Sequence, residues 1–221
     1  MSAEAAARPD ADVEFQFHDA RYQADTALSG MWLFLASELL FFGGLFLSWC
    51  VYRHQHPAGF ADATRDTQFA IGTINTVVLV TSSFVYACAV AFARRGDNRR
   101  VLMASLSTMA LGVLFLGLKV LEWFLDIRDG KVPGASFRFK GAHNGGDELF
   151  WIFYYIGTGL HGVHLAIGIA LVGWIAWKAH KQAFSKNFTT PVEAVGLYWS
   201  FVDMVWMVLY PLIYLAGRAA G

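Results

Sequence analysis

Charged residues are scarce in this chain, and their scarcity narrows the class of protein. Lysine, arginine, aspartate and glutamate make up 15% of the 221 residues, whereas a soluble domain carries about a quarter. The 17 basic and 17 acidic side chains give a net charge of zero, so nothing indicates nucleic-acid binding. The only 2 cysteines, Cys50 and Cys88, lie far apart inside apolar runs. They are predicted to be small core residues and not a disulfide or a metal-binding pair.

Long apolar runs are present instead. Hydrophobic residues make up 56% of the chain, and the mean hydropathy is +0.43. A helix needs roughly 20 apolar residues to cross a bilayer, whereas a barrel strand needs about 10 in alternation. The sequence therefore predicts an all-α membrane protein, a bundle of five transmembrane helices. The expected spans are about 28–52, 69–93, 101–125, 148–177 and 195–216.

The segments outside the spans predict how the chain is organised across the membrane. Residues 1–27 are polar and their charged side chains are mostly acidic, so we expect an N-terminal tail followed by one transmembrane domain over residues 28–217. An acidic start is unlike a secretory signal or an organellar transit peptide, which favours the cytoplasmic membrane of a bacterium. The turn RRGDNRR, residues 94–100, is the densest basic cluster beside a span. Because basic turns stay in the cytoplasm, we predict a cytoplasmic N-terminus and an external C-terminus.

Six ionisable residues fall within the predicted spans. Each would cost roughly 3 kcal/mol if it faced lipid alone, so each is expected to have a partner. They are Glu38, Lys119, Glu122, His161, His164 and Asp203. Lys119 and Glu122 are three residues apart, so they can neutralise each other or extend to the interface, which favours a structural role. The last five are predicted to form a membrane-embedded polar network.

Glu38 has two interpretations. It lies near the middle of the first span, with no basic residue in its own helix. It is either a neutral carboxylic acid that hydrogen-bonds across helices, or a group that exchanges protons or contacts lipid. The residues alone favour neither.

A stripe of small and imidazole side chains marks the fourth span, within YIGTGLHGVHLAIGI. Gly157, His161, His164 and Gly168 fall at helical spacings of four, three and four. Glycines such as these and Gly162 permit close helix packing, and imidazoles in hydrocarbon need a partner. The stripe must therefore face protein, a cavity or bound lipid, and Asp203 is the expected partner of one histidine.

Metal and cofactor sites find little support in the sequence. A bis-histidine heme needs an imidazole on a second span, and the other five histidines lie in loops, tails or span ends. A zinc or copper site needs more ligands than HxxH and one distant aspartate. P-loop, HExxH and GxSxG motifs are missing. We expect no metal, cofactor or catalytic redox centre in this chain, and not an enzyme that acts alone.

Five motifs in order resemble a known family. They are GMWLFLASELLFFGGLF (30–46), GTINTVVLVTSS (72–83), LGLKVLEW (116–123), GTGLHGVHLAIG (157–168) and LYWSFVDMVWMVLYPLIYL (197–215). Together they resemble subunit III of the heme-copper cytochrome c oxidases, over about residues 18–217. Each motif alone is weak, but the ordered set is highly specific.

The resemblance implies the short bacterial form with five spans, part of a complex that reduces oxygen in aerobic respiration and translocates protons. Such a subunit carries no heme or copper, which reside in partner subunits. It packs against subunit I in a complex with subunit II, binds phospholipid in a cleft and supports proton uptake. Glu38 matches the family's buried carboxylate that reacts with hydrophobic carbodiimides, and Glu122, His161, His164 and Asp203 fall on its polar positions. Ser200 departs from the pattern, because the family has a histidine there.

Two other functions remain open from the sequence. One is the accessory protein of nitric oxide reductase, which shares the five-span pattern and would be distinguished by its neighbouring genes. The other is a free-standing membrane enzyme or di-heme cytochrome, which an absorption spectrum of the purified chain would reveal.

Overall fold

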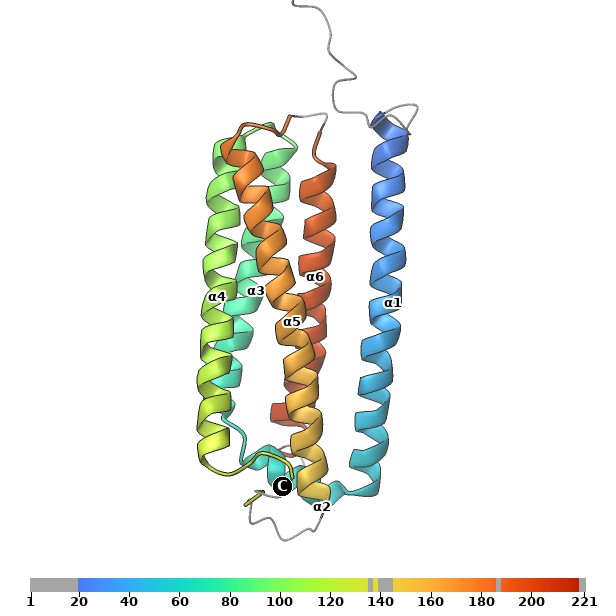
Figure 1. The fold of residues 1–221 in the computed structure, drawn as a ribbon, viewed down its shortest axis with the longest axis vertical. Coiled ribbons are helices and arrows are strands. Elements are labelled where there is room, and N and C mark those ends of the chain that lie inside the picture. Colours follow the sequence, from blue (N-terminus) through green and yellow to red (C-terminus); the bar gives the residue numbers. More distant parts are fainter. Residues whose placement is uncertain (1–19, 135–136, 139–144, 186–187, 219–221) are drawn as a thin grey trace, which may run out of the picture.

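Five long helices run side by side along the molecule in a computed structural model of the chain (Figure 1). The structure describes residues 20–134, 137–138, 145–185 and 188–218. All five helices are long and apolar enough to span a membrane. The predicted all-α architecture with five spans is confirmed, and the chain is a multi-pass membrane protein. The long helices are α1 (Ala20–Gln55), α3 (Phe69–Ala93), α4 (Asn98–Arg128), α5 (Gly146–His180) and α6 (Thr190–Tyr210).

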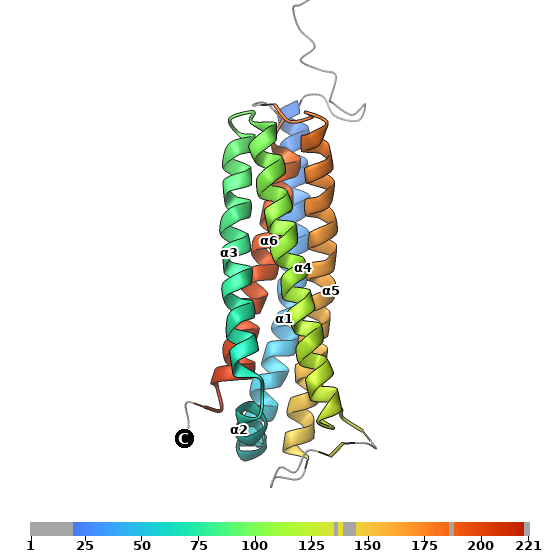
Figure 2. The same ribbon diagram turned by 90° about the vertical axis from the view of Figure 1, so that its left-hand side faces the viewer.

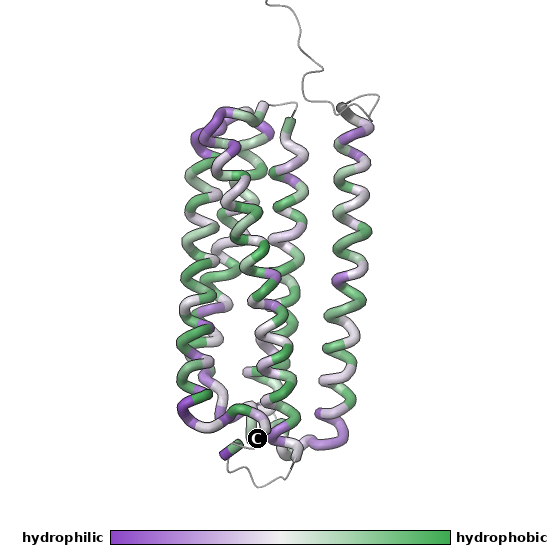
Figure 3. The backbone as a smooth tube through the Cα atoms, viewed as in Figure 1, coloured by the Kyte–Doolittle hydropathy of each residue, from purple (hydrophilic) through white to green (hydrophobic). Residues whose placement is uncertain are grey.

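Most helices extend beyond the predicted spans. α1 has 36 residues, which at about 1.5 Å per residue exceeds the roughly 30 Å of hydrocarbon. The end turns can remain helical there because water satisfies the backbone groups that hydrocarbon would leave unpaired. α1 begins at Ala20, so the last eight residues of the expected tail are helical; residues 1–19 lie outside the described part. Figure 3 shows the hydrophobic lengths of the bundle between more hydrophilic ends.

A short helix replaces the loop expected after the first span. α2 (Pro57–Arg65) begins with Pro57, which is favoured in the first helical turn because it lacks an amide proton. It crosses the lower end of the bundle in Figures 1 and 2. A Cβ atom on Gly59 would lie 2.8 Å from the backbone of Gly146 and Asp147. Glycine therefore lets α2 pack closely against the start of α5.

Proline also shapes the end of the last span. A proline inside a helix lacks the backbone amide proton and disturbs the regular turn, and from Pro211 to Leu215 the backbone forms a π-helix, η1. The Ala216 amide donates to the Pro211 carbonyl at 2.9 Å, a step of five residues. This wider turn carries Tyr214 into the core, where its side chain is fully buried.

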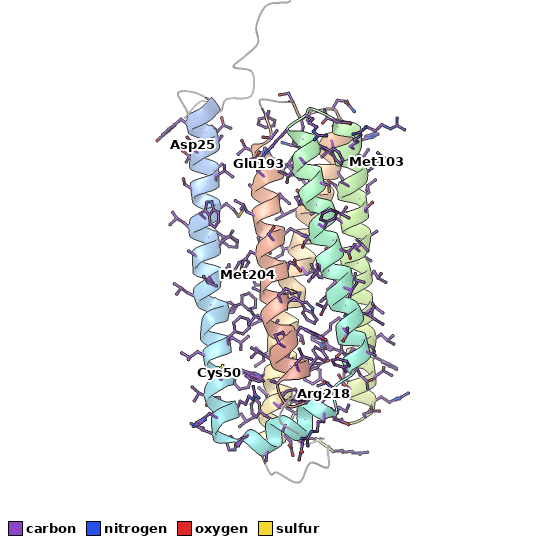
Figure 4. The ribbon with its side chains drawn as sticks, turned by 180° about the vertical axis from the view of Figure 1, so that it is seen from behind. Asp25, Cys50, Met103, Glu193, Met204 and Arg218 are labelled. Carbon is purple, nitrogen blue, oxygen red and sulfur yellow. The ribbon has the colours of Figure 1, made fainter. Side chains whose placement is uncertain are left out.

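The packing is uneven across the bundle. α3, α4, α5 and α6 form a core with Trp151, Trp199 and Trp206 fully buried. α1 stands to one side of this core and contacts α6, α5 and α2 (Figure 1). Asp25, near the start of α1, and Arg218, at the end of the described chain, lie at opposite ends of the bundle (Figure 4). An odd number of spans requires this arrangement.

Candidate functional site: two buried polar networks and a groove

Lys119 and Glu122 lie inside the bundle and form an ion pair. The Lys119 Nζ is 3.1 Å from the Glu122 Oε2, as their spacing of three on α4 allows. Lys119 is 4% exposed and Glu122 is 0% exposed. The alternative that they extend to the membrane interface is therefore wrong, because both side chains point toward α5 and η1.

Two tyrosines complete the surroundings of this pair. The Lys119 ammonium has three N–H groups, and they meet Glu122, the Tyr154 hydroxyl at 3.2 Å and the Tyr214 hydroxyl at 2.8 Å. Tyr214 donates to Glu122 Oε1 at 2.6 Å. Tyr154 lies 3.0 Å from Glu122 Oε1 and 3.0 Å from Asp126 Oδ2. Buried charges are tolerated only when they are paired and hydrogen-bonded, and here both conditions hold.

The same network continues to the surface near α2. Lys131 lies 3.1 Å from Asp126 and 2.7 Å from Asp66, whose side chain is half-exposed. Burial alone would lower the pKa of Lys131, but hydrogen bonds and charges from Asp66 and Asp126 outweigh it and raise the pKa. We call Lys119, Glu122, Asp126, Lys131, Tyr154 and Tyr214 the α4 network.

Sequence reasoning missed most of the α4 network. Asp126 follows Glu122 by four residues, so helical spacing could have placed it on the same stripe. Tyr154 and Tyr214 come from segments 32 and 92 residues away from Glu122. The packing of α5 and η1 against α4 places these tyrosines beside Glu122, and no local sequence pattern predicts this packing.

Glu38 and His164 form a second pair across helices. The Glu38 Oε2 is 3.0 Å from the His164 Nε2, which joins α1 to α5 over 126 residues of sequence. The other ring nitrogen, Nδ1, lies 2.8 Å from the Leu160 carbonyl, which can only accept, so Nδ1 carries a proton. The contact to Glu38 therefore holds a single proton, carried by either Nε2 or the carboxyl group. The side chains are 20% and 15% exposed, so water or lipid can reach them.

Asp203 was expected to pair with His161 or His164, and this prediction is wrong. The face of α6 that carries Asp203 also carries Trp199 and Trp206. This face is turned toward α3, since Trp199 donates to Ser82 at 3.2 Å and Trp206 donates to Thr76 at 3.0 Å. Asp203 Oδ1 has no hydrogen-bond partner among the described residues.

His161 is buried among aromatic side chains. Its ring packs against Phe115 and Trp206, with centroids 5.6 and 5.1 Å away. Neither ring nitrogen has a hydrogen-bond partner within the described parts of the chain. The ring is held in the core by aromatic packing, and the two histidines of HxxH have different surroundings.

Of the three alternatives for the glycine stripe, which were protein, a cavity or bound lipid, Gly157 and Gly168 face protein. A Cβ on Gly168 would lie 3.1 Å from the Trp199 ring, and one on Gly157 would lie 3.2 Å from Leu209. Both therefore let α6 approach α5. Gly162 differs, because its Cβ would meet only Leu116, at 4.0 Å.

A groove separates α1 from α6 and α3. It consists of two hollows of about 320 and 290 Å³, both lined by Trp32, Leu197 and Ser200. The upper hollow also contains Arg94 and Glu193, which pair at 3.0 Å, and the lower one is lined almost wholly by apolar side chains such as that of Met204 (Figure 4). Ser200, the departure from the family pattern, is thus an exposed residue in this groove.

Candidate metal ligands are dispersed. Among the residues that the structure describes, no three histidine, cysteine, aspartate or glutamate side chains are grouped to hold a metal ion. Cys50 and Cys88 are free thiols, as predicted, but Cys50 is exposed and Cys88 is half-buried, so the prediction of a core position is wrong for Cys50.

Comparison with known proteins covers nearly the whole chain. The model of the family "Cytochrome c oxidase subunit III" matches residues 12–218. The cytochrome c oxidase subunit 3 of Synechocystis sp. is 31% identical over 199 residues, 90% of this chain and 79% of that protein. The quinol oxidase subunit 3 of Bacillus spizizenii is 28% identical over 201 residues, 89% and 91% of the two chains. The heme-copper oxidase subunit I+III of Aeropyrum pernix is 27% identical over 200 residues, 88% of this chain and 23% of that longer protein.

Proposed function

The chain belongs to the cytochrome c oxidase subunit III family of the heme-copper oxidases, and from this premise we propose three tasks for it. As a non-redox subunit of a cytochrome c oxidase, it stabilises the catalytic subunit I, binds phospholipid and supports proton uptake. The observation that carries the proposal is the Glu38–His164 pair, which joins α1 to α5. Heme and copper belong to the partner subunits, and the membrane is the bacterial cytoplasmic membrane.

The shape and chemistry of the groove support lipid binding. An acyl chain needs an apolar channel, and its headgroup needs a polar or charged mouth. The lower hollow provides the first, and Arg94 at the upper hollow provides the second. The basic turn 94–100 lies at the same end of the bundle as the start of α1 (Figure 1), which supports a cytoplasmic N-terminus.

The fused Aeropyrum protein supports contact with subunit I. Its name combines subunits I and III in one chain, so the two units stay together there. For the present chain we expect α5 to take part in this contact. Gly162 has free space above it, and its neighbour Val163 is 58% exposed. Small residues beside exposed apolar ones permit close helix approach in a membrane.

The Glu38–His164 pair supports proton exchange. It holds one proton that can rest on either group without changing the net charge, and both side chains are partly exposed. A transfer between the two groups would move the proton from one helix to the other without leaving an uncompensated charge.

Replacement of Glu38 tests the proton task in the assembled oxidase. Glu38→Gln keeps an oxygen that can accept from His164, so the complex should purify with native stoichiometry and its initial rate of oxygen reduction. We expect activity to decay several-fold faster during turnover. Asp25→Asn, an exposed acid on the same helix, is the matched control. Equal decay in the native and Glu38→Gln complexes would leave hydrogen bonding as the only role of this pair.

Filling the groove tests the lipid task separately. Ser200→Trp places a large ring in both hollows, whereas Met207→Trp changes an exposed position of α6 that lines neither. Mass spectrometry should find less phospholipid bound to the first complex only.

Assays with reduced cytochrome c and with quinol will identify the electron donor, because relatives named for cytochrome c oxidase and for quinol oxidase exist.

A further inference from the structure

The Tyr154 hydroxyl lies between two buried carboxylates. Its oxygen is 3.0 Å from Glu122 Oε1 and 3.0 Å from Asp126 Oδ2. Both carboxylates are 0% exposed, and Tyr154 is 1% exposed. A phenol has one proton, so it can donate to only one of them.

The other donors around Tyr154 are already used. All three N–H groups of Lys119 have partners, namely Glu122 and the two tyrosine hydroxyls. The Tyr214 proton goes to Glu122 Oε1, at 2.6 Å. If both carboxylates were ionised, one of the two 3.0 Å contacts would bring two oxygens together without a hydrogen between them. In a core of low polarity such a contact is repulsive.

The nearby ammonium groups leave Asp126 incompletely compensated. Lys119 pairs with Glu122, and Lys131 is shared between Asp126 at 3.1 Å and Asp66 at 2.7 Å. Three carboxylates therefore share two ammonium groups. Asp129 also lies 3.9 Å from Lys131, but it pairs with Arg128 at 3.6 Å, and Arg218 donates to Thr67 and to backbone carbonyls instead. The titratable groups around the two carboxylates are Lys119 on α4, Lys131 and Asp66 in the loops, Tyr155 on α5 and Tyr214 on η1. His161 on α5 interacts with Lys119 and not with the carboxylates.

We propose that Glu122, Tyr154 and Asp126 bind one additional proton, shared between the two carboxyl groups through the tyrosine hydroxyl. In one arrangement Asp126 Oδ2–H donates to the Tyr154 oxygen, and Tyr154 donates to Glu122 Oε1. In the other, the Asp126 proton has moved to the tyrosine oxygen and the tyrosine proton to Glu122. Two protons shift together, the tyrosine stays neutral, and the net effect is transfer of one proton between the carboxyl groups.

This proton site opens toward one end of the bundle. Lys131 connects Asp126 to the half-exposed Asp66 near α2, on the side where the described chain ends. At the inner end, Lys119 lies against the Trp206 ring, with its Nζ 5.5 Å from the centroid. Beyond that ring is His161, whose nitrogens have no partner in the described residues. The site is therefore a reservoir that loads from the Asp66 end. It is separate from the Glu38–His164 pair and does not depend on the proposed function of that pair.

Infrared spectroscopy of the purified oxidase complex tests the shared proton. A protonated carboxyl group has a C=O stretching band that a carboxylate lacks, and the band moves in D₂O. In native-minus-variant difference spectra, Glu122→Gln and Asp126→Asn should each remove the same single band, and the double variant should remove no more than either. Asp97→Asn, at the far end of α4, should remove none. Loss of no band, or of two different bands that add in the double variant, would overturn the proposal.

Tyr154→Phe keeps every charge and provides a second test if an amide variant does not assemble. The proton should remain, now on one carboxyl group without the tyrosine contact, so its band should persist at a higher frequency. A band that disappears or stays in place in this variant would show that the tyrosine does not bridge the two groups.

Discussion

Replacing Lys119 with methionine should destabilise the bundle strongly. Methionine has a similar volume but removes the ammonium, so Glu122 keeps its tyrosine donors and loses its only cation at 3.1 Å. Since the glutamate is 0% exposed, water cannot replace the lost charge. Removing one partner of a buried pair costs about 3–5 kcal/mol. For a chain of this size, that corresponds to a midpoint of thermal unfolding lower by roughly 6–20 °C.

A double variant distinguishes the effect of the broken ion pair on stability from a general loss of packing. Lys119→Met combined with Glu122→Gln removes both charges, so a part of the stability should return. The assay heats the detergent-solubilised oxidase and follows alkylation of Cys88, a half-buried free thiol on α3, by mass spectrometry of its peptide. Lys181→Met, an exposed lysine after α5, is the matched control. A single-variant cost below about 1 kcal/mol, or single costs that add in the double variant within about 0.5 kcal/mol, would refute the reasoning.

Three further predictions concern other contacts. A Cβ on Gly72 would lie 2.7 Å from the Tyr214 ring, so Gly72→Ala should cost about 1–3 kcal/mol by the Cys88 assay, whereas Gly43→Ala, with open space around it, should melt like the native chain. Gly162→Leu has room within the chain and should leave its melting unchanged while it lowers the amount of subunit I that co-purifies; normal stoichiometry would remove α5 from the proposed interface. Because the folded pKa of Lys131 is raised, its contribution to stability is complete below the ordinary value of 10.5 and is lost as pH rises through the folded value. The melting temperature of the native protein should therefore fall above pH 10.5. The Lys131→Met variant should have a lower melting temperature below that pH and a smaller fall above it.

The network positions explain why buried charge is present at all in this membrane protein. Glu38 and His164 hold α1 to α5, and the α4 network joins α4, α5, η1 and the loop before α3. In each case the polar contact links segments that are far apart in the sequence. For both networks we have proposed a carboxyl group that shares a proton, and such a role is compatible with a structural one.

The sequence by itself determined the number of spans, the class of protein and the polar positions. Apolar run length and helical spacing are local properties, and they predicted the five helices, the Lys119–Glu122 pair and the protein-facing stripe of Gly157 and Gly168. Tertiary structure decided which groups meet. His164 pairs with Glu38 and not with Asp203, because the face of α6 that carries Asp203 is turned toward α3. Partners that lie 126 or 92 residues apart depend on how whole helices rotate and pack against one another. That rotation is set by the fit of many side chains together, which no single stretch of sequence contains.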